Sequence, residues 1–159
     1  MENNITKMLT LQEKRDKAKL IIKLVNNYFS VECNVKYRND SVVLPRQIAI
    51  YLIHRNIVLS LAEIGKLFVS RKNTHLDHST IIHNKNKVIS WLSINDKSVV
   101  SHVDNLKNDA ELISKFTPLE VEKIKIQDEI LELIKNYSKS DLILLKQELD
   151  KKDFYESIK

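Results

Sequence analysis

Glycine, proline and cysteine are scarce in this chain of 159 residues, which contains one Gly, two Pro and one Cys. Because tight hairpins and sharp turns depend on glycine and proline, their scarcity disfavours a fold rich in β-hairpins. Cys33, alone, cannot form an internal disulfide or supply a four-cysteine zinc site. Hydrophobic residues make up 43% of the chain, and most recur at the three- and four-residue spacing of helices. The sequence therefore predicts an all-α protein.

Three longer patterns are also missing. No apolar run approaches the roughly 18 residues of a membrane span, and residues 1–19 lack the apolar core of a signal peptide. No G-x-x-x-x-G-K-[ST] sequence is present, so we expect no P-loop nucleotide site. We therefore predict a cytoplasmic protein without a membrane partner.

Positive charge is concentrated in the first two thirds of the sequence. Residues 1–103 contain 16 Lys and Arg against 8 Asp and Glu, whereas residues 104–159 contain 10 against 13. Four of the five arginines lie in a short span, at Arg38, Arg46, Arg55 and Arg71. A basic half suits a polyanion such as nucleic acid. Charge alone is equally consistent with an ordinary basic surface.

Residues 60–88 have the pattern of two short helices joined by a turn. Ser60 and Glu63 form a capping box that opens the first helix, and Asp77 is an N-cap for the second. The buried stripe of the first helix is predicted to contain Leu61, Ile64 and Phe68. The inward face of the second is predicted to contain Ile81, Ile82, Val88, Ile89 and Leu92. This is the pattern of a helix-turn-helix, whose second helix places its N-terminal residues in the DNA major groove.

Three motifs in order carry a resemblance to a known family. They are Leu-Pro-Arg-Gln-Ile-Ala-Ile-Tyr-Leu at 44–52, Ser-Leu-Ala-Glu-Ile-Gly-Lys-Leu-Phe at 60–68, and Asp-His-Ser-Thr-Ile-Ile-His at 77–83. Together they resemble the C-terminal DNA-binding domain of the bacterial replication initiator DnaA, over residues 18–103. The resemblance implies a helix-turn-helix that binds double-stranded DNA.

The resemblance also implies roles for individual residues. Base contacts would come from the start of the second helix, with one arginine in the minor groove: Asp77, His78, Ser79, Thr80 and Arg38. Asp77 suits a cytosine amino group, and the hydroxyl-bearing residues suit hydrogen bonds or a thymine methyl. Phosphate contacts would come from seven basic or histidine residues: Lys36, Arg46, His54, Arg71, Lys72, His83 and Lys87. For Arg46, a position near a helix N-terminus also suits a phosphate by charge and by free N–H groups.

Three departures from the family pattern concern the DNA contacts. Asp40 stands where relatives often carry a second basic residue of the loop, and His54 stands where lysine is common. The turn at 69–76 is longer than the usual Gly-Gly-Arg link, and Leu76 occupies the position of its arginine. A longer turn changes where the second helix sits, so the family's target sequence is not transferred here.

The remaining segments also have helical patterns. Thr10 and Glu13 form a capping box for a helix to Phe29. Residues 31–43 are expected to be a loop, followed by a helix that begins at Pro45. The one glycine, Gly65, lies inside a predicted helix, where it points to close approach of another helix. Further helices are expected at 99–113, from Pro118 after a capping box at Thr117 and Glu120, and from Ser140 or Asp141.

The predicted organisation has three parts: an N-terminal helical extension at 1–17, the helix-turn-helix domain at 18–114, and a C-terminal helical hairpin at 115–159. The hairpin is negatively charged and amphipathic, with Phe154 on its apolar face. Its apolar face would serve either to pack on the domain or to associate with a second copy or another protein. Sequence alone leaves both alternatives open.

We expect no catalytic residue, no metal and no cofactor. His75, His78 and His83 lack a thiolate or carboxylate at suitable spacing for a metal. Ser79 lacks the strained elbow and oxyanion donors that would make it a nucleophile beside a histidine. The leading hypothesis is therefore a non-enzymatic, nucleoid-associated DNA-binding protein in replication initiation, its regulation, or transcription regulation, with replication or transcription proteins as further partners. The alternative is an adaptor of phage or mobile-element type that uses the C-terminal hairpin for protein partners.

Overall fold

The chain is all-α. The computed structural model describes residues 9–36 and 39–157, of which 150–157 are described as backbone alone. These residues form seven helices and no strand beyond one isolated bridge. The helices are α1 (Leu11–Phe29), α2 (Asp40–Asn56), α3 (Leu61–Gly65), α4 (His78–Ser93), α5 (Lys97–Lys115), α6 (Pro118–Ile134) and α7 (Lys139–Ser157). The chain divides into two compact units, Met1–Thr117 and Pro118–Lys159.

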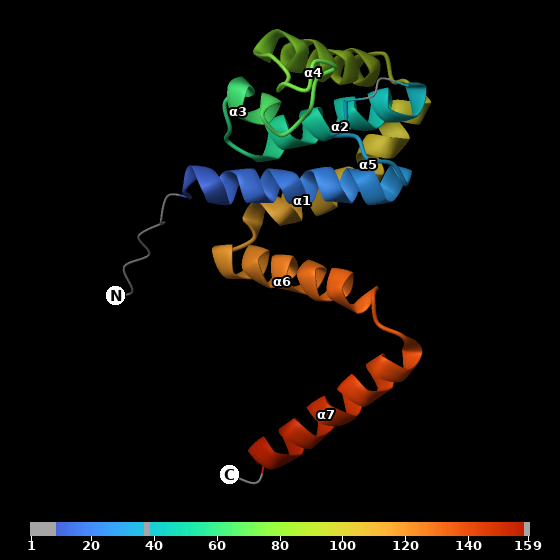
Figure 1. Cartoon of the computed structure of the whole chain (residues 1–159). Coiled ribbons are helices and arrows are strands. Elements are labelled where there is room, and N and C mark those ends of the chain that lie inside the picture. Colours follow the sequence, from blue (N-terminus) through green and yellow to red (C-terminus); the bar gives the residue numbers. More distant parts are fainter. Residues whose placement is uncertain (1–8, 37–38, 158–159) are drawn as a thin grey trace, which may run out of the picture. The chain divides into compact units, whose positions relative to one another are not determined.

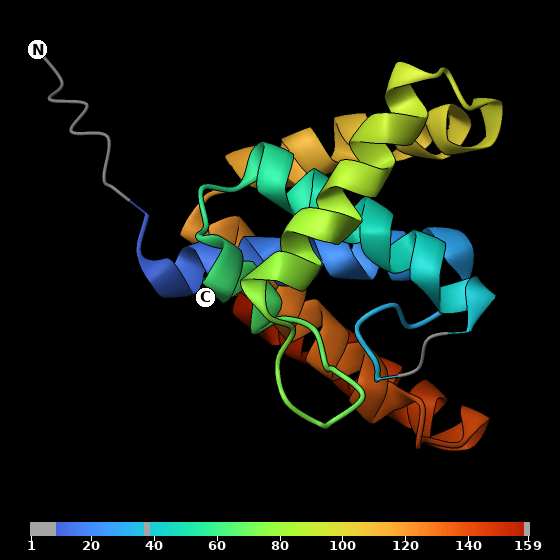
Figure 2. The same cartoon turned by 90° about the horizontal axis from the view of Figure 1, so that it is seen from above.

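Helix α2 is the centre of the first unit. Every residue from Pro45 to Ile53 is buried, as expected for a helix that neighbours cover on all sides. Helices α1, α4 and α5 all pack against α2. Figure 1 shows α4, α2 and α1 in successive layers, and Figure 2, seen from above, shows α4 crossing over α2. The arrangement leaves the outer face of α4 uncovered.

Three predicted helix starts are confirmed by their capping bonds. Thr10 and Glu13 form a reciprocal box, with Glu13 N donating to Thr10 Oγ1 at 3.2 Å and Thr10 N donating to Glu13 Oε2 at 2.6 Å. Ser60 Oγ accepts from Glu63 N at 3.2 Å. Asp77 Oδ1 accepts from Thr80 N at 2.7 Å. Each bond satisfies an N–H group that the helix itself leaves unpaired.

An ion-pair network joins α1 to α3. Arg15 Nε donates to Glu63 Oε2 at 2.8 Å, and Lys66 Nζ donates to Glu63 Oε1 at 2.6 Å. Hydrogen bonds from Lys66 and Arg15 lower the pKa of the Glu63 carboxyl. The network fixes the short helix α3 against the long helix α1, so that α3 supports the turn leading to α4.

The start of α2 differs from the sequence prediction. The helix begins at Asp40, so that Pro45 is inside it and the predicted loop ends earlier. Val42 is buried and Leu44 packs against the core, which explains why residues 40–44 join the helix. Pro45 lies close enough to the start that its missing N–H removes only one early hydrogen bond.

The predicted inward face of α4 was too wide. Ile81 and Val88 are fully buried and Leu92 packs partly against the core, but Ile82 is 36% exposed and Ile89 is 45% exposed. Successive side chains along an α-helix point in directions about 100° apart around the helix axis. Since α4 is an outer layer, only a narrow stripe is covered, and Ile82 and Ile89 fall beyond its edge.

The remaining boundaries are close to those expected. Helix α1 runs across the predicted boundary at 17 and 18, so residues 11–17 share one helix with the start of the domain. Helix α6 begins at Pro118, as predicted. Helix α7 begins earlier than predicted, because Ser138 rather than Ser140 or Asp141 is its cap and bonds reciprocally with Asp141. The side chain of Phe154 lies outside the described residues, and the pairing of α6 with α7 as a hairpin stays a prediction.

Candidate nucleic-acid interface

A contact between Gly65 and Leu76 sets the position of α4. Leu76 N donates to Gly65 O at 3.2 Å, and a Cβ on Gly65 would lie only 2.1 Å from Leu76 O. Gly65 therefore permits a close approach, as its place in the sequence indicated, but the approaching group is the backbone before α4 rather than another helix. Leu76, at the position of the family's arginine, is 5% exposed and belongs to the core.

The long turn at 69–76 is an ordered hairpin-like segment, which we call the basic turn. Val69 and His75 form an antiparallel bridge. Ser70 N donates to Thr74 O at 2.7 Å, and Asn73 N donates to Ser70 O at 3.1 Å. Asn73 takes the left-handed conformation, with φ of 57°, which asparagine tolerates better than most residues. Arg71 and Lys72 are exposed between these anchors.

The predicted base-contacting residues Asp77, His78, Ser79 and Thr80 occupy the cap and first turn of α4. His78 and Ser79 are exposed, and Thr80 is half-buried. The hydrogen bond from Thr80 N is the main cause that lowers the pKa of the Asp77 carboxyl. Because a carboxylate offers about four acceptor sites, capping leaves Asp77 able to accept a further donor.

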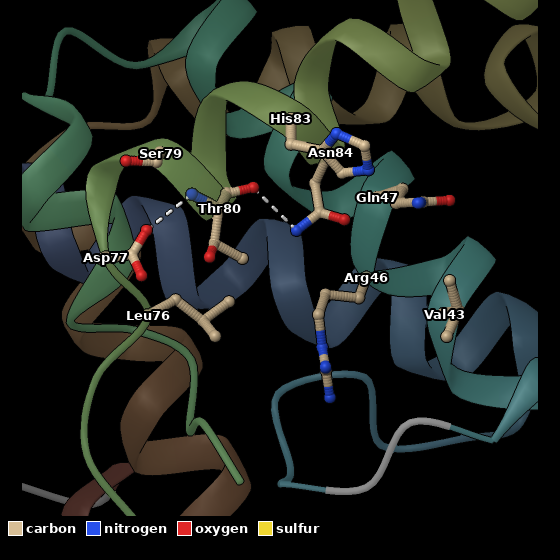
Figure 3. Close-up of a pocket in the computed structure, with 9 residues that line it drawn as sticks. All are labelled: Val43, Arg46, Gln47, Leu76, Asp77, Ser79, Thr80, His83 and Asn84. Atoms are coloured by element: carbon tan, nitrogen blue, oxygen red, sulfur yellow. Dashed lines mark hydrogen bonds between the residues drawn. The ribbon is translucent and has the colours of Figure 1, made fainter. Parts of the chain in front are cut away.

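A pocket of about 460 Å³ lies between α2 and the start of α4 (Figure 3). Its lining brings together four predicted contact residues of the α4 region with one from α2. The lining residues are Val43, Arg46, Gln47, Leu76, Asp77, Ser79, Thr80, His83 and Asn84. The Asn84 side chain, which lines the pocket, donates to Thr80 O at 2.9 Å and so stabilises the first turn of α4.

Gln47 is a pocket residue that sequence reasoning missed. It is 6% exposed, and its side-chain oxygen is, within the described residues, the one buried side-chain polar atom without a hydrogen-bond partner. A buried amide left unsatisfied costs free energy unless a partner completes it. The sequence feature that could have indicated Gln47 is its position directly after Arg46 in the motif at 44–52. Val43 and Asn84 also line the pocket, although neither was among the predicted contact residues.

Arg46 lies in a different environment from the one predicted. The side chain is 4% exposed and extends from α2 toward the loop before it (Figure 3). Its Nε donates to Cys33 O at 2.8 Å, and its Nη2 donates to Val35 O. Burial raises the pKa of the Cys33 thiol to about 12, so Cys33 is a neutral packing residue. A phosphate contact by Arg46 stays a prediction.

The other predicted phosphate contacts are spread over four segments, which are the loop before α2, α2 itself, the basic turn and α4. Lys36 is exposed in the loop before α2, and Lys87 is exposed on α4 outside the pocket lining. His54, near the end of α2, also lies outside it, and partial burial, with Lys85 nearby, lowers the pKa of its ring. A neutral His54 is a weaker phosphate ligand than the lysine common in relatives. Arg38, the predicted minor-groove residue, lies outside the described residues.

A model of the family described as the bacterial DnaA protein helix-turn-helix matches residues 18–88. Residues 18–88 are a DnaA-type helix-turn-helix domain. The matched span contains α2, α3, the basic turn and the first turns of α4, and thus every lining residue of the pocket.

Similar proteins agree with this assignment of the DnaA-type domain. The chromosomal replication initiator protein DnaA of Lachnoclostridium phytofermentans is 40% identical over 72 residues, which is 43% of this chain and 15% of that protein. DnaA of Herpetosiphon aurantiacus is 31% identical over 113 residues, which is 69% of this chain and 20% of that protein. A crystal structure of a DNA replication initiation factor matches 63% of this chain and 30% of its own, with a TM-score of 0.51 and 28% identity. The chain thus spans a fifth or less of these two initiators.

Neither a metal-binding cluster nor a membrane-spanning helix occurs in the part of the chain that the structure describes. The residues whose side chains are described, 9–36 and 39–149, contain no group of three or more His, Cys, Asp or Glu that could hold a metal ion. None of the helices formed by the described residues is both long enough and apolar enough to span a bilayer.

Proposed function

We propose that this chain binds double-stranded DNA in a sequence-dependent way, with the first turn of α4 in the major groove. The observation that carries the proposal is the first turn of α4, with Asp77, His78 and Ser79 exposed and Thr80 half-buried, at the rim of a pocket in a DnaA-type domain. Hydroxyl, imidazole and carboxylate groups there suit base edges, whose donors and acceptors differ for each base pair in this groove. Arg38 is proposed to enter the minor groove.

Phosphate contacts hold the domain on the duplex in this proposal. Lys36 and the basic turn carry exposed cations on two segments that flank the start of α4. His83, Lys87 and His54 would add contacts along α4 and α2. Such contacts fix the register of the protein on DNA and supply affinity that does not depend on sequence. Arg46 differs from the others, because its guanidinium is buried.

The process we propose is replication initiation or its regulation. The support is the similarity to proteins named chromosomal replication initiators. Transcription regulation from similar sites would use the same contacts. We further propose that the chain acts without catalysis, because the residues at the pocket serve as caps, acceptors and donors rather than as an activated nucleophile and its base.

Selection of bound sequences from a random duplex library tests the proposal. The expected result is one enriched motif for the chain and loss of that enrichment for Ser79→Ala, while Ser90→Ala, a matched change further along α4, keeps it. Binding to all duplexes with equal affinity, or the same motif for both variants, would contradict base contacts by the first turn.

A second candidate function is assembly with a protein partner through α6. Large apolar side chains on α6 and just after it follow helical spacing and are about half exposed or more: Leu119, Ile126, Ile130, Leu133 and Tyr137. An apolar stripe of this kind is typical of a helix that associates with another helix. Sedimentation of the chain over a range of concentrations tests self-association, and Ile130→Glu should abolish any dimer. A chain that stays monomeric at all concentrations would contradict self-association through α6 and would not affect the proposal of DNA binding.

A further inference from the structure

The loop between α1 and α2 is held by side-chain and backbone hydrogen bonds from several elements. Asn26, on α1, accepts from Cys33 N at 2.9 Å through its Oδ1. Val69 N, at the start of the basic turn, donates to Asn34 O at 3.1 Å. Arg46, on α2, donates to the carbonyls of Cys33 and Val35. The loop carries Lys36 directly after these anchors, so its position decides where this cation lies.

Arg46 is the residue best placed to fix the loop. Its side chain is 4% exposed, and two nitrogens of one planar group donate to carbonyls two residues apart. A guanidinium presents several donors in a fixed fork, whereas a lysine ammonium is a single centre on a flexible stem. The fork thus sets the loop backbone in one conformation, and hydrogen bonds from a charged donor are the stronger kind.

The hydrogen bond between Asn34 and Val69 extends this effect to the basic turn. The loop and the turn come from distant parts of the sequence, and each carries exposed cations, Lys36 on one and Arg71 with Lys72 on the other. Both segments would therefore depend on a loop that Arg46 holds in place. A binding surface that already has its bound conformation in the free protein loses less conformational entropy when it binds DNA.

We infer that Arg46 is a positioning residue, which holds the loop at 33–36 and, through Asn34 and Val69, the basic turn in the conformation that contacts DNA. The part of this inference about DNA rests on the proposed function, whereas the part about the loop concerns the free protein. If Arg46 only contacted phosphate, its contribution to DNA binding would not depend on the loop. If Arg46 positions the loop, its contribution depends on Lys36, the cation that the loop carries.

Amide hydrogen exchange in the free protein tests the structural part. In Arg46→Met, protection of the Val69 amide should fall by about tenfold or more, while that of core amides such as Leu52 is kept. Arg46→Lys should resemble Arg46→Met. The matched control is Arg55→Met, which removes the same charge from an exposed position on the same helix and should leave Val69 protected. Unchanged protection of Val69 in Arg46→Met would overturn the inference, whether or not the chain binds DNA.

A double-mutant cycle tests the functional part. Lys36→Ala should weaken binding to a duplex in the wild-type chain but add little to Arg46→Met, with a coupling of about twofold or more in Kd. Additive losses, together with recovery of affinity in Arg46→Lys, would assign Arg46 to a phosphate contact and overturn the positioning role. If no duplex binds the wild-type chain, the proposed function fails while the exchange result still decides the role of Arg46.

A neutral variant keeps the inference testable if Arg46 variants fail to fold. Asn26→Ala removes a different anchor of the same loop without changing the charge of the protein. It should lower both the protection of Val69 and the affinity for DNA, although no phosphate contact is lost. Normal protection and normal affinity in Asn26→Ala would show that the anchored loop is not needed, and would overturn the inference.

Discussion

At the scale of single residues, the start of α4 combines structural roles with the proposed DNA contacts. Asp77 caps the helix through Thr80 N, and the Thr80 carbonyl in turn accepts from Asn84. Ser79 lies between them and is exposed. A change at Ser79 thus reports on DNA contact alone, whereas changes at Asp77 or Thr80 also alter the helix end.

For Ser79→Ala, we expect a loss of about 1–3 kcal/mol at the preferred duplex and little change on random DNA. The reason is the removal of one hydroxyl that can bond a base edge without any bond within the helix being lost. Titration of both duplexes, with Tm measured in parallel, checks the expectation. Equal weakening on both duplexes would argue against a base contact.

For Asp77→Ala, we expect a lower Tm at neutral pH, because the α4 cap is removed. The pKa of Asp77 is lowered in the folded protein, chiefly by the Thr80 N–H. Stability from this group is therefore present above the ordinary aspartate pKa of about 4 and is lost as pH falls through the lower folded pKa. The difference in Tm between wild type and variant should shrink in acid, as circular dichroism at several pH values would show. Asp77→Asn, which keeps a capping oxygen, is the control.

At the scale of elements, local signals predicted the helices better than the contacts between them. The caps at Thr10, Ser60 and Asp77 involve residues three apart, so the sequence contains the whole interaction. The burial of Arg46 depends on carbonyls of a loop eleven to thirteen residues away, which no local pattern encodes. Exposure of Ile82 depends on how many layers cover α4, a property of packing rather than of spacing.

Gly65→Ala tests the close approach that positions α4. Alanine favours a helix, yet its Cβ would lie 2.1 Å from Leu76 O, a backbone atom that cannot rotate away. We expect a net destabilisation of about 1–3 kcal/mol, as in other overpacked sites, measured by urea unfolding. Ala62→Val, at an exposed position of the same helix, should have a much smaller effect. A stabilised Gly65→Ala would refute the steric account.

The basic turn is tested by replacing its two exposed cations. Arg71→Ala combined with Lys72→Ala should reduce the slope of log affinity against log salt by about two units, since each phosphate contact contributes roughly 0.9. The hydrogen bonds of Ser70 with Thr74 remain, so the fold should be kept. Lys107→Ala with Lys115→Ala, on α5, removes the same charge and should leave the slope nearly unchanged. A slope equal in all three proteins would show that the turn does not contact DNA.

At the scale of the whole molecule, charge differs between the two compact units. Residues 1–117 contain 18 Lys and Arg against 11 Asp and Glu, whereas residues 118–159 contain 8 against 10. The unit with the DnaA-type domain is thus basic, and the second unit is slightly acidic. Like-sign repulsion from the second unit would oppose approach to phosphate, to an extent that falls as salt screens it.

A fragment that ends after Thr117 should therefore fold and bind DNA at least as tightly as the full chain at low salt. The cut belongs there rather than after Ser114, because Phe116 packs against the core of the first unit and the Ser114 carbonyl accepts from the buried Lys17 Nζ at 2.8 Å. Shortening to 114 would remove Phe116 from the core and would place the Ser114 oxygen that bonds Lys17 at a chain end, so the shorter fragment should melt earlier. Circular dichroism, light scattering and salt-dependent titration of the two fragments and the full chain decide the outcome. A fragment 1–117 that aggregates would show that α6 or α7 completes the core of the first unit, whereas a folded fragment that has lost affinity for paired sites alone would locate self-association in the second unit.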